Sequence, residues 1–61
     1  MYKVKTIFND GTCKVEKTDV FEQAIGAFSI YIADPEVEYT CVLRAGNNVR
    51  IIAEYDIREG I

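Results

Sequence analysis

The first hydrophobic pattern in the chain has a period of two. From residue 3 to residue 8, Val4, Thr6 and Phe8 share one side of an extended chain, and Lys3, Lys5 and Ile7 share the other. This alternation predicts a strand, and Asp10-Gly11 is a strong signal for a two-residue type I′ hairpin loop. Such a loop joins strands at about 2–8 and 12–17. The register that it predicts pairs Phe8 with Cys13, Thr6 with Val15 and Lys5 with Glu16.

The next segment changes to helical spacing, over about residues 19–33. Thr18 or Asp19 is expected to cap the helix, with Glu22 completing a capping box, and Asp34-Pro35 is expected to end it. The apolar stripe expected to face a sheet is Phe21, Ala24, Ile25, Phe28, Tyr31 and Ile32, widened by Val20 and Ala27. The opposite side has one charge and consists of Glu22, Gln23, Gly26, Ser29, Ile30 and Ala33.

Alternation returns in the last third of the chain and predicts a second hairpin, with strands at about 37–45 and 49–57. A two-residue loop at Gly46-Asn47 or at Asn47-Asn48 mixes apolar and charged partners. A three-residue loop over 46–48 keeps them separate, because asparagine tolerates the left-handed conformation that such loops need. The register expected from it pairs Ala45 with Val49, Leu43 with Ile51, Cys41 with Ala53 and Tyr39 with Tyr55.

The element order strand, strand, helix, strand, strand predicts one α+β domain over residues 1–61. The simplest assembly is a two-layer ββαββ fold, a four-stranded antiparallel sheet with one helix packed on one face. The pattern leaves open which strands are neighbours between the two hairpins.

Composition narrows the function classes. The chain has 61 residues, no histidine, no tryptophan and two cysteines, Cys13 and Cys41. Both cysteines fall on expected apolar faces, so we interpret them as reduced core residues of a cytoplasmic protein. The N-terminus does not lead into a signal-like apolar run and no stretch is long enough to cross a membrane. We therefore predict no metal, no cofactor, no membrane association and no enzyme activity.

Small size and uneven charge shape the expected partners. A domain this short buries little of its surface and often gains stability from a second subunit. The net charge of −3 divides into +2 over residues 1–17 and −5 over residues 18–61. An acidic chain is a poor general binder of nucleic acid, although a local anion site remains compatible with it.

The outer face of the second hairpin is the first candidate contact surface. The expected register places Val42 opposite Ile52 between two like-charged pairs, Arg44–Arg50 at one end and Glu38–Asp56 at the other, with Thr40 opposite Glu54. Like charges directly opposite destabilise a sheet, whereas a two-fold axis would bring the arginines of one subunit onto the acids of the other. The interface residues predicted here are Val42, Arg44, Arg50, Ile52 and Glu54.

The back of the helix is the second candidate. Gly26 and Ser29 beside Ile30 would allow close approach of another helix or a partner protein, and a mid-helix glycine costs about 1 kcal/mol relative to alanine. One of the two surfaces would serve self-association and the other a partner.

The sequence leaves two further hypotheses about function open. Arg44 and Arg50, near Asn47 and Asn48, could bind a small phosphorylated ligand such as a nucleotide, because guanidinium forks match phosphate. Alternatively, the chain is an acidic nucleic-acid mimic, and the side chains standing in for phosphates would be Asp34, Glu36, Glu38, Glu54, Asp56 and Glu59.

A resemblance covers roughly residues 18–56. It rests on Phe21, Ala24, Phe28 and Tyr31 in the helix, then Asp34-Pro35-Glu36-Val37-Glu38, the Gly46-Asn47 turn and Glu54-Tyr55-Asp56. This pattern resembles small orphan proteins from bacteriophage accessory regions. The resemblance implies a binding protein directed at the host or its defences, and it carries no catalytic residues. The sequence thus favours a non-enzymatic, homodimeric protein-binding module.

Overall fold

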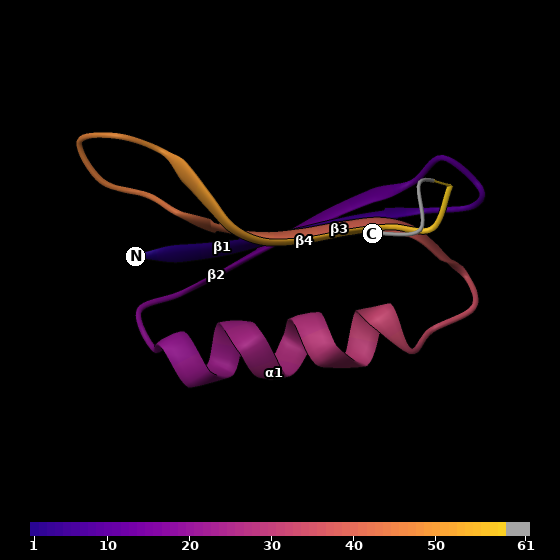
Figure 1. Cartoon of the computed structure of the whole chain (residues 1–61), viewed down its shortest axis with the longest axis horizontal. Coiled ribbons are helices and arrows are strands. Elements are labelled where there is room, and N and C mark those ends of the chain that lie inside the picture. Colours follow the sequence, from indigo (N-terminus) through magenta and orange to yellow (C-terminus); the bar gives the residue numbers. More distant parts are fainter. Residues whose placement is uncertain (59–61) are drawn as a thin grey trace.

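A computed structural model describes residues 1–58 and confirms the ββαββ order (Figure 1). The strands β1 (Tyr2–Phe8) and β2 (Cys13–Thr18) precede the helix α1 (Phe21–Ile32). The strands β3 (Val37–Arg44) and β4 (Arg50–Asp56) follow it. Every expected element is present, with ends that lie within one or two residues of those expected.

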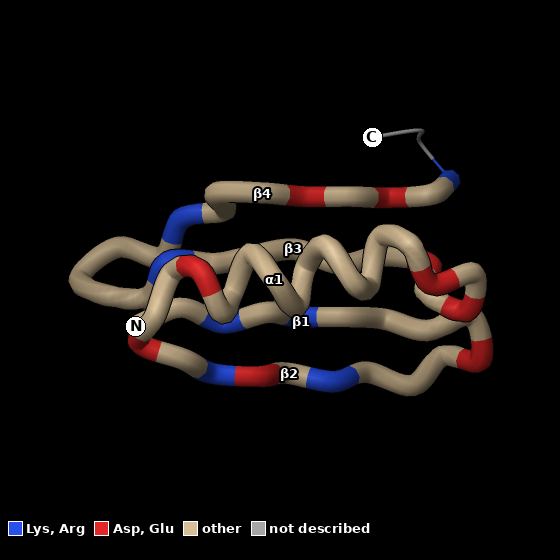
Figure 2. Tube along the Cα trace, turned by 90° about the horizontal axis from the view of Figure 1, so that it is seen from below, with Lys and Arg blue, Asp and Glu red and all other residues tan. Residues whose placement is uncertain are grey.

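All four strands form one antiparallel sheet in the order β2-β1-β3-β4. The two hairpins therefore join through β1 and β3, the neighbours that the sequence left open. The helix lies along one face of the sheet (Figure 1). Seen from the helix side, α1 runs over β1 and β3, while β2 and β4 form the two edges (Figure 2).

The first turn differs from the two-residue loop that Asp10-Gly11 predicted. The amide of Phe8 donates to the carbonyl of Thr12 at 2.9 Å, and the amide of Gly11 donates to the carbonyl of Phe8 at 2.9 Å. Gly11 has a φ of 89°, so the loop has three residues and ends in a left-handed glycine. The register becomes Ile7–Cys13, Lys5–Val15 and Val4–Glu16. The predicted register is wrong by one residue, and a one-residue slip exchanges the two faces of a strand.

The second hairpin keeps the predicted register only near its loop. Arg44 lies opposite Arg50 and Leu43 lies opposite Ile51, as expected. The register then shifts, because Ile52 is an extra residue of β4, a β-bulge. Beyond the bulge the observed pairs are Val42–Ala53, Cys41–Glu54, Thr40–Tyr55 and Tyr39–Asp56. The predicted pairs Val42–Ile52, Thr40–Glu54, Cys41–Ala53 and Tyr39–Tyr55 are therefore wrong.

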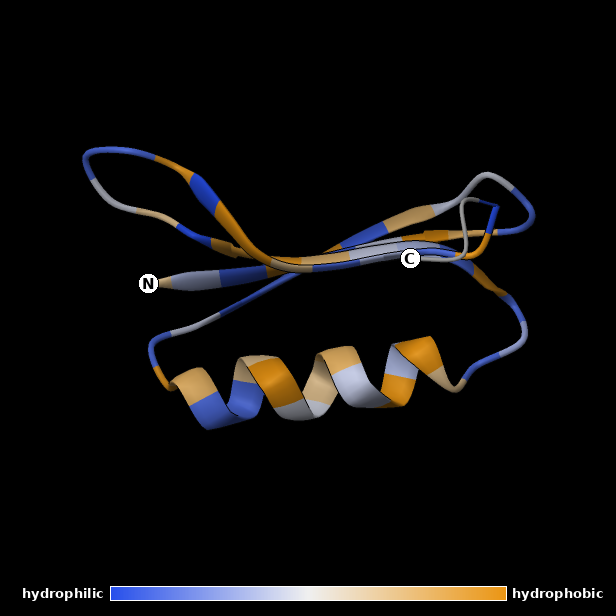
Figure 3. Cartoon of the chain, in the orientation of Figure 1, coloured by the Kyte–Doolittle hydropathy of each residue, from blue (hydrophilic) through white to orange (hydrophobic). Residues whose placement is uncertain are grey.

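The core lies between the helix and the two central strands. Val4 of β1, Val42 of β3 and Ala24 of α1 are buried together. The side chains packed around them are Tyr2, Ile25, Ala27, Phe28, Tyr31 and Ala53. Figure 3 shows hydrophobic bands along the length of the helix, and Phe21 and Ile32 near its two ends are exposed.

Both ends of the helix are set by short polar turns. The N-cap residue of the helix is Val20, and no side chain makes a capping hydrogen bond there. The cap expected from Asp19 is therefore wrong. The Thr18 hydroxyl instead accepts from the Val20 amide at 3.1 Å and donates to Gln23 Oε1 at 2.8 Å. At the other end the Asp34 carboxylate accepts from the Glu36 amide at 2.9 Å, which turns the chain away at Pro35 as predicted.

Candidate contact surfaces

The registers of the four strands place fourteen side chains on the face of the sheet that α1 covers. Val4 and Val42 contact Ala24 of the helix, and Glu16 on β2 accepts a 3.1 Å hydrogen bond from the hydroxyl of Tyr31, which identifies this side. We call this side the covered face. Across β2, β1, β3 and β4 its rows are Thr18–Tyr2–Arg44–Arg50, Glu16–Val4–Val42–Ala53 and Lys14–Thr6–Thr40–Tyr55, and the pair Phe8–Val37 extends it on β1 and β3.

The other side of the sheet, which we call the open face, has no covering layer among residues 1–58 (Figure 1). Its rows in the same strand order are Lys17–Lys3–Leu43–Ile51, Val15–Lys5–Cys41–Glu54 and Cys13–Ile7–Tyr39–Asp56. Seven of these twelve side chains are hydrophobic, the same number as on the covered face. The face left to solvent therefore carries as many hydrophobic side chains as the face under the helix.

Polar groups on β1, β2 and β3 in the middle of the covered face have partners within the chain. Thr6 and Thr40, both fully buried, lie opposite each other and their hydroxyls are 3.1 Å apart in a hydrogen bond. Lys14 lies 3.3 Å from Glu16. The hydrogen bond to Glu16, followed by that to Tyr31, raises the pKa of Lys14. The arginines Arg44 and Arg50, at the loop end of the same face, have no such partner among residues 1–58.

Most charges on the open face lie at two opposite corners, and Lys5 lies in its middle row between Val15 and Cys41. Lys3 lies directly opposite Lys17, and neither makes an ion pair with any of residues 1–58. At the other corner, Glu54 accepts a 2.5 Å hydrogen bond from the hydroxyl of Tyr39, and this bond, followed by burial, raises the pKa of Tyr39. Asp56 is mostly buried and lies 3.6 Å from Arg58. Figure 2 shows the blue segments of β1 and β2, with one red segment between those of β2, and the red segments of β4.

The surface predicted from the second hairpin does not exist as one patch. Val42 is 0% exposed and contacts the helix, so its expected place on an outer face is wrong. Arg44 and Arg50 lie on the covered side, Glu54 lies on the open face, and Ile52 occupies the bulge. The bulge separates arginines from acids because it reverses the alternation between Ile51 and Ala53.

The predicted helix surface is intact. Gly26, Ser29 and Ile30 are all exposed, and Ile30 is 70% exposed. A side chain at Gly26 would meet nothing within 4 Å, and the Ser29 hydroxyl donates to the carbonyl of Ile25 at 2.9 Å. Packing within the chain therefore does not require the glycine.

The two cysteines lie on the same, open face of the sheet but differ in exposure. Cys41 is buried as expected, but Cys13 is exposed, so its interpretation as a core residue is wrong. The slip of the first hairpin accounts for the error, because it turns Cys13 and Val15 away from the helix. Both thiols are free.

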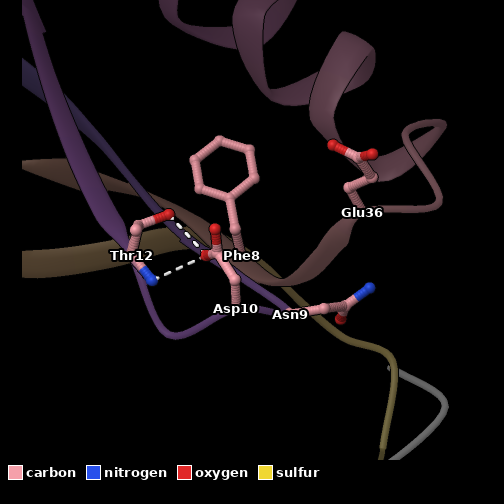
Figure 4. A pocket seen from close by; sticks show the side chains of 5 residues that line it. All are labelled: Phe8, Asn9, Asp10, Thr12 and Glu36. Atoms are coloured by element: carbon pink, nitrogen blue, oxygen red, sulfur yellow. Dashed lines mark hydrogen bonds between the residues drawn. The ribbon is translucent and has the colours of Figure 1, made fainter.

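A hollow at the end of the first hairpin is lined by Phe8, Asn9, Asp10, Thr12 and Glu36 (Figure 4). Its polar groups are largely used within the chain. Asp10 accepts hydrogen bonds from the amide and the hydroxyl of Thr12, which hold the pKa of Asp10 below its usual value. The Asn9 amide donates to the carbonyl of Glu36, and its side chain donates to that of Pro35. This hollow joins the hairpin to the turn that follows the helix.

A second hollow, of about 500 Å³, lies at the opposite end of the sheet, at the loop of the second hairpin. It contains all four residues that the sequence proposed for a phosphorylated ligand: Arg44, Asn47, Asn48 and Arg50. Met1, Ala45 and Gly46 complete its lining. The structure thus brings these four residues together at one site.

The side chains of residues 1–58 include no cluster of three or more potential metal ligands. No described helix has the length and apolar character needed to span a membrane.

No protein-family model, curated protein or solved structure matches this chain.

The sequence did not predict which residues make up most of the open face. Lys3, Lys17, Val15 and Tyr39 were each assigned to strands but not to a shared surface. The available signal was Asn9-Asp10-Gly11, which suits a three-residue loop ending in a left-handed glycine as well as a two-residue loop. The bulge at Ile52 has no comparable signal in the sequence.

Proposed function

We propose that this chain is a non-enzymatic protein-binding module that forms a homodimer through its open face. The observation that supports this proposal is the uncovered apolar surface itself. Val15 and Ile51 are 50% and 57% exposed, and Ile7, Tyr39 and Leu43 lie partly exposed between them. An antiparallel sheet commonly keeps one face in water, but that face is then polar.

The small core supports the same conclusion. Among residues 1–58, only five hydrophobic side chains are buried: Val4, Ala24, Val37, Cys41 and Val42. Two sheets packed face to face form a shared core about 10 Å thick. Each apolar side chain buried there would contribute about 25 cal/mol per Å² removed from water. A second copy therefore supplies the layer that this domain lacks.

Charge placement favours a second copy as the occupant. A two-fold axis between two open faces can bring the Lys3–Lys17 corner of one subunit over Glu54, the exposed acid at the opposite corner of its partner. Opposite charges at the rim select orientation and exclude mismatched contacts. The sequence also predicted self-association through opposite charges related by a two-fold axis, but with different residues.

The acidic-mimic hypothesis receives less support. Glu38 and Asp56 lie within 3.6 Å of Arg58, and Glu54 binds Tyr39. Asp34 accepts from the Glu36 amide, and Glu59 lies outside the described residues. Carboxylates engaged in this way are not arranged as a regular row of free anions. In the role that the bacteriophage resemblance implies, the dimer would act by binding a host protein.

The experiment is light scattering on a concentration series of the wild type, Ile51→Glu and Ile30→Glu. Both substitutions place a carboxylate at an exposed isoleucine, but only Ile51 lies on the open face. We expect a wild-type dimer and an Ile30→Glu dimer. Ile51→Glu should weaken association at least about thirtyfold, the effect of losing about 2 kcal/mol at an interface centre.

Circular dichroism of the same samples shows whether each variant remains folded. A monomeric wild type at all concentrations contradicts the proposal. If Ile30→Glu alone dissociated the dimer, the contact between subunits would lie at the back of the helix and not at the open face.

A further inference from the structure

Two arginines meet at the loop end of the second hairpin without a counter-charge. Arg44 and Arg50 are directly opposite each other on β3 and β4. Within residues 1–58, neither guanidinium makes an ion pair or a side-chain hydrogen bond. Like charges on directly opposed residues repel, and their Cβ atoms are typically only about 5 Å apart. This pair therefore weakens the hairpin unless an anion lies between the two groups.

The surroundings of the pair form a receptive site. Arg44 and Arg50 line the 500 Å³ hollow together with the loop from Ala45 to Asn48. The Ala45 amide donates to the carbonyl of Met1 at 2.9 Å, which fixes the start of the loop against β1. The side-chain amides of Asn47 and Asn48 add neutral hydrogen-bond donors at the same hollow. No acidic residue lines it.

We infer that this hollow binds the phosphate group of a small phosphorylated molecule. Each guanidinium presents a planar fork of N–H donors that matches two phosphate oxygens, and two forks can share one dianion. A phosphate bound there converts the Arg44–Arg50 repulsion into two attractions. The net charge of −3 and the acidic β4 segment repel a long polyanion, which favours a small ligand over nucleic acid.

The phosphate site is separate from the dimer surface. Arg44 and Arg50 lie on the covered side, in the same row as Tyr2. Lys3 and Lys17 lie in the adjacent row, on the open face. A phosphate ligand and the second subunit would therefore bind at different places. The outcome of one experiment does not determine the outcome of the other.

The test combines amide chemical shifts with thermal melting during titration at constant ionic strength. The probes are inorganic phosphate and adenosine monophosphate, with chloride as the reference anion. Phosphate should shift the amides of residues 44–50 and raise the melting temperature of the wild type. Equal responses to both probes identify phosphate as the ligand group, and a stronger response to the nucleotide extends the site to its base and sugar.

The variants Arg44→Gln and Arg50→Gln should be more stable than the wild type without phosphate but should bind phosphate more weakly. Without phosphate, each should melt at a higher temperature than the wild type, because the repulsion is gone. With phosphate, each should bind about tenfold more weakly, the effect of losing one charged hydrogen-bonding partner. Lys17→Gln removes one positive charge from the open face and should bind phosphate like the wild type.

Three results would overturn the inference. One is a response to phosphate no larger than that to chloride. Another is an equal loss of binding in Lys17→Gln and Arg44→Gln. The third is a set of shifted amides that excludes residues 44–50.

Discussion

The two faces of this sheet carry the same number of hydrophobic side chains, although the helix covers only one of them. The covered face packs under α1 with a central pair of buried threonines, and seven of its fourteen side chains are hydrophobic. The open face has seven hydrophobic side chains of twelve, with Lys5 in its middle row and its other charges at two corners. The helix supplies apolar surface to the first face, through Ile25, Phe28 and Tyr31. The comparison indicates that the position of the helix, and not the number of apolar side chains on a face, distinguishes the two sides of this sheet.

The largest expected effect is the difference in folding between two variants that introduce an aspartate, one on each face. Val42→Asp puts a carboxylate in a site that is 0% exposed, and we expect the domain to unfold. An unpaired buried charge costs several kcal/mol, and a chain of this length has a total stability of about 3–9 kcal/mol. Val15→Asp, on the open face, should keep the fold and lose the dimer. Circular dichroism and light scattering measure the two effects.

An unfolded Val15→Asp variant would show that the open face is part of the folding core of a single subunit. A folded Val42→Asp variant would show that β3 is less constrained than its burial indicates.

A smaller effect should come from the hydroxyl pair of the covered face. Thr6→Val alone leaves the buried hydroxyl of Thr40 without its partner at 3.1 Å, which costs about 1–3 kcal/mol. The double variant with Thr40→Val removes both polar groups and should recover most of that loss. Urea unfolding of the wild type, both single variants and the double variant measures this coupling. Additive losses would mean that the two hydroxyls do not act as a pair.

The smallest expected effect is a dependence on pH at the open face. The hydrogen bond to Glu54 raises the pKa of Tyr39 above 10, its value in the unfolded chain. The neutral phenol is therefore favoured in the fold, so this contribution is complete below pH 10 and is lost as the pH rises through the folded pKa. The melting temperature of the wild type should fall more between pH 9 and pH 11 than that of Tyr39→Phe. Parallel curves would show that the Tyr39–Glu54 bond does not contribute to stability in solution.

Sequence reasoning was reliable where the signal is local. The helix between Thr18 and Asp34-Pro35 and the two hairpins follow from periodicity and turn residues, and the structure confirms them. Thr18 takes part in the turn before the helix, but through the Val20 amide and Gln23 instead of as the cap. The meeting of Arg44 and Arg50 was also predictable, because the pair lies next to the loop that fixes its register.

Sequence reasoning failed where a single residue decides the register. Gly11 fits both loop lengths, and the observed choice turns Cys13 and Val15 outward while Glu16 reaches Tyr31 of the helix. The bulge at Ile52 separates Arg50 from Glu54, and Val42 lies in the core because the helix covers the opposite side of β3 from the expected one. Both decisions depend on what lies across the sheet and under the helix, which no local window contains.

The sequence by itself determined the number, type and order of the elements, because hydrophobic period, turn residues and Pro35 act within a few residues of each other. The tertiary structure decided the strand order β2-β1-β3-β4 and which side chains share a face. The physical reason is the two-residue period of a strand. A shift of one residue leaves every strand in place but exchanges its buried and exposed sides, so only packing against the helix and the neighbouring strands selects one of the two arrangements.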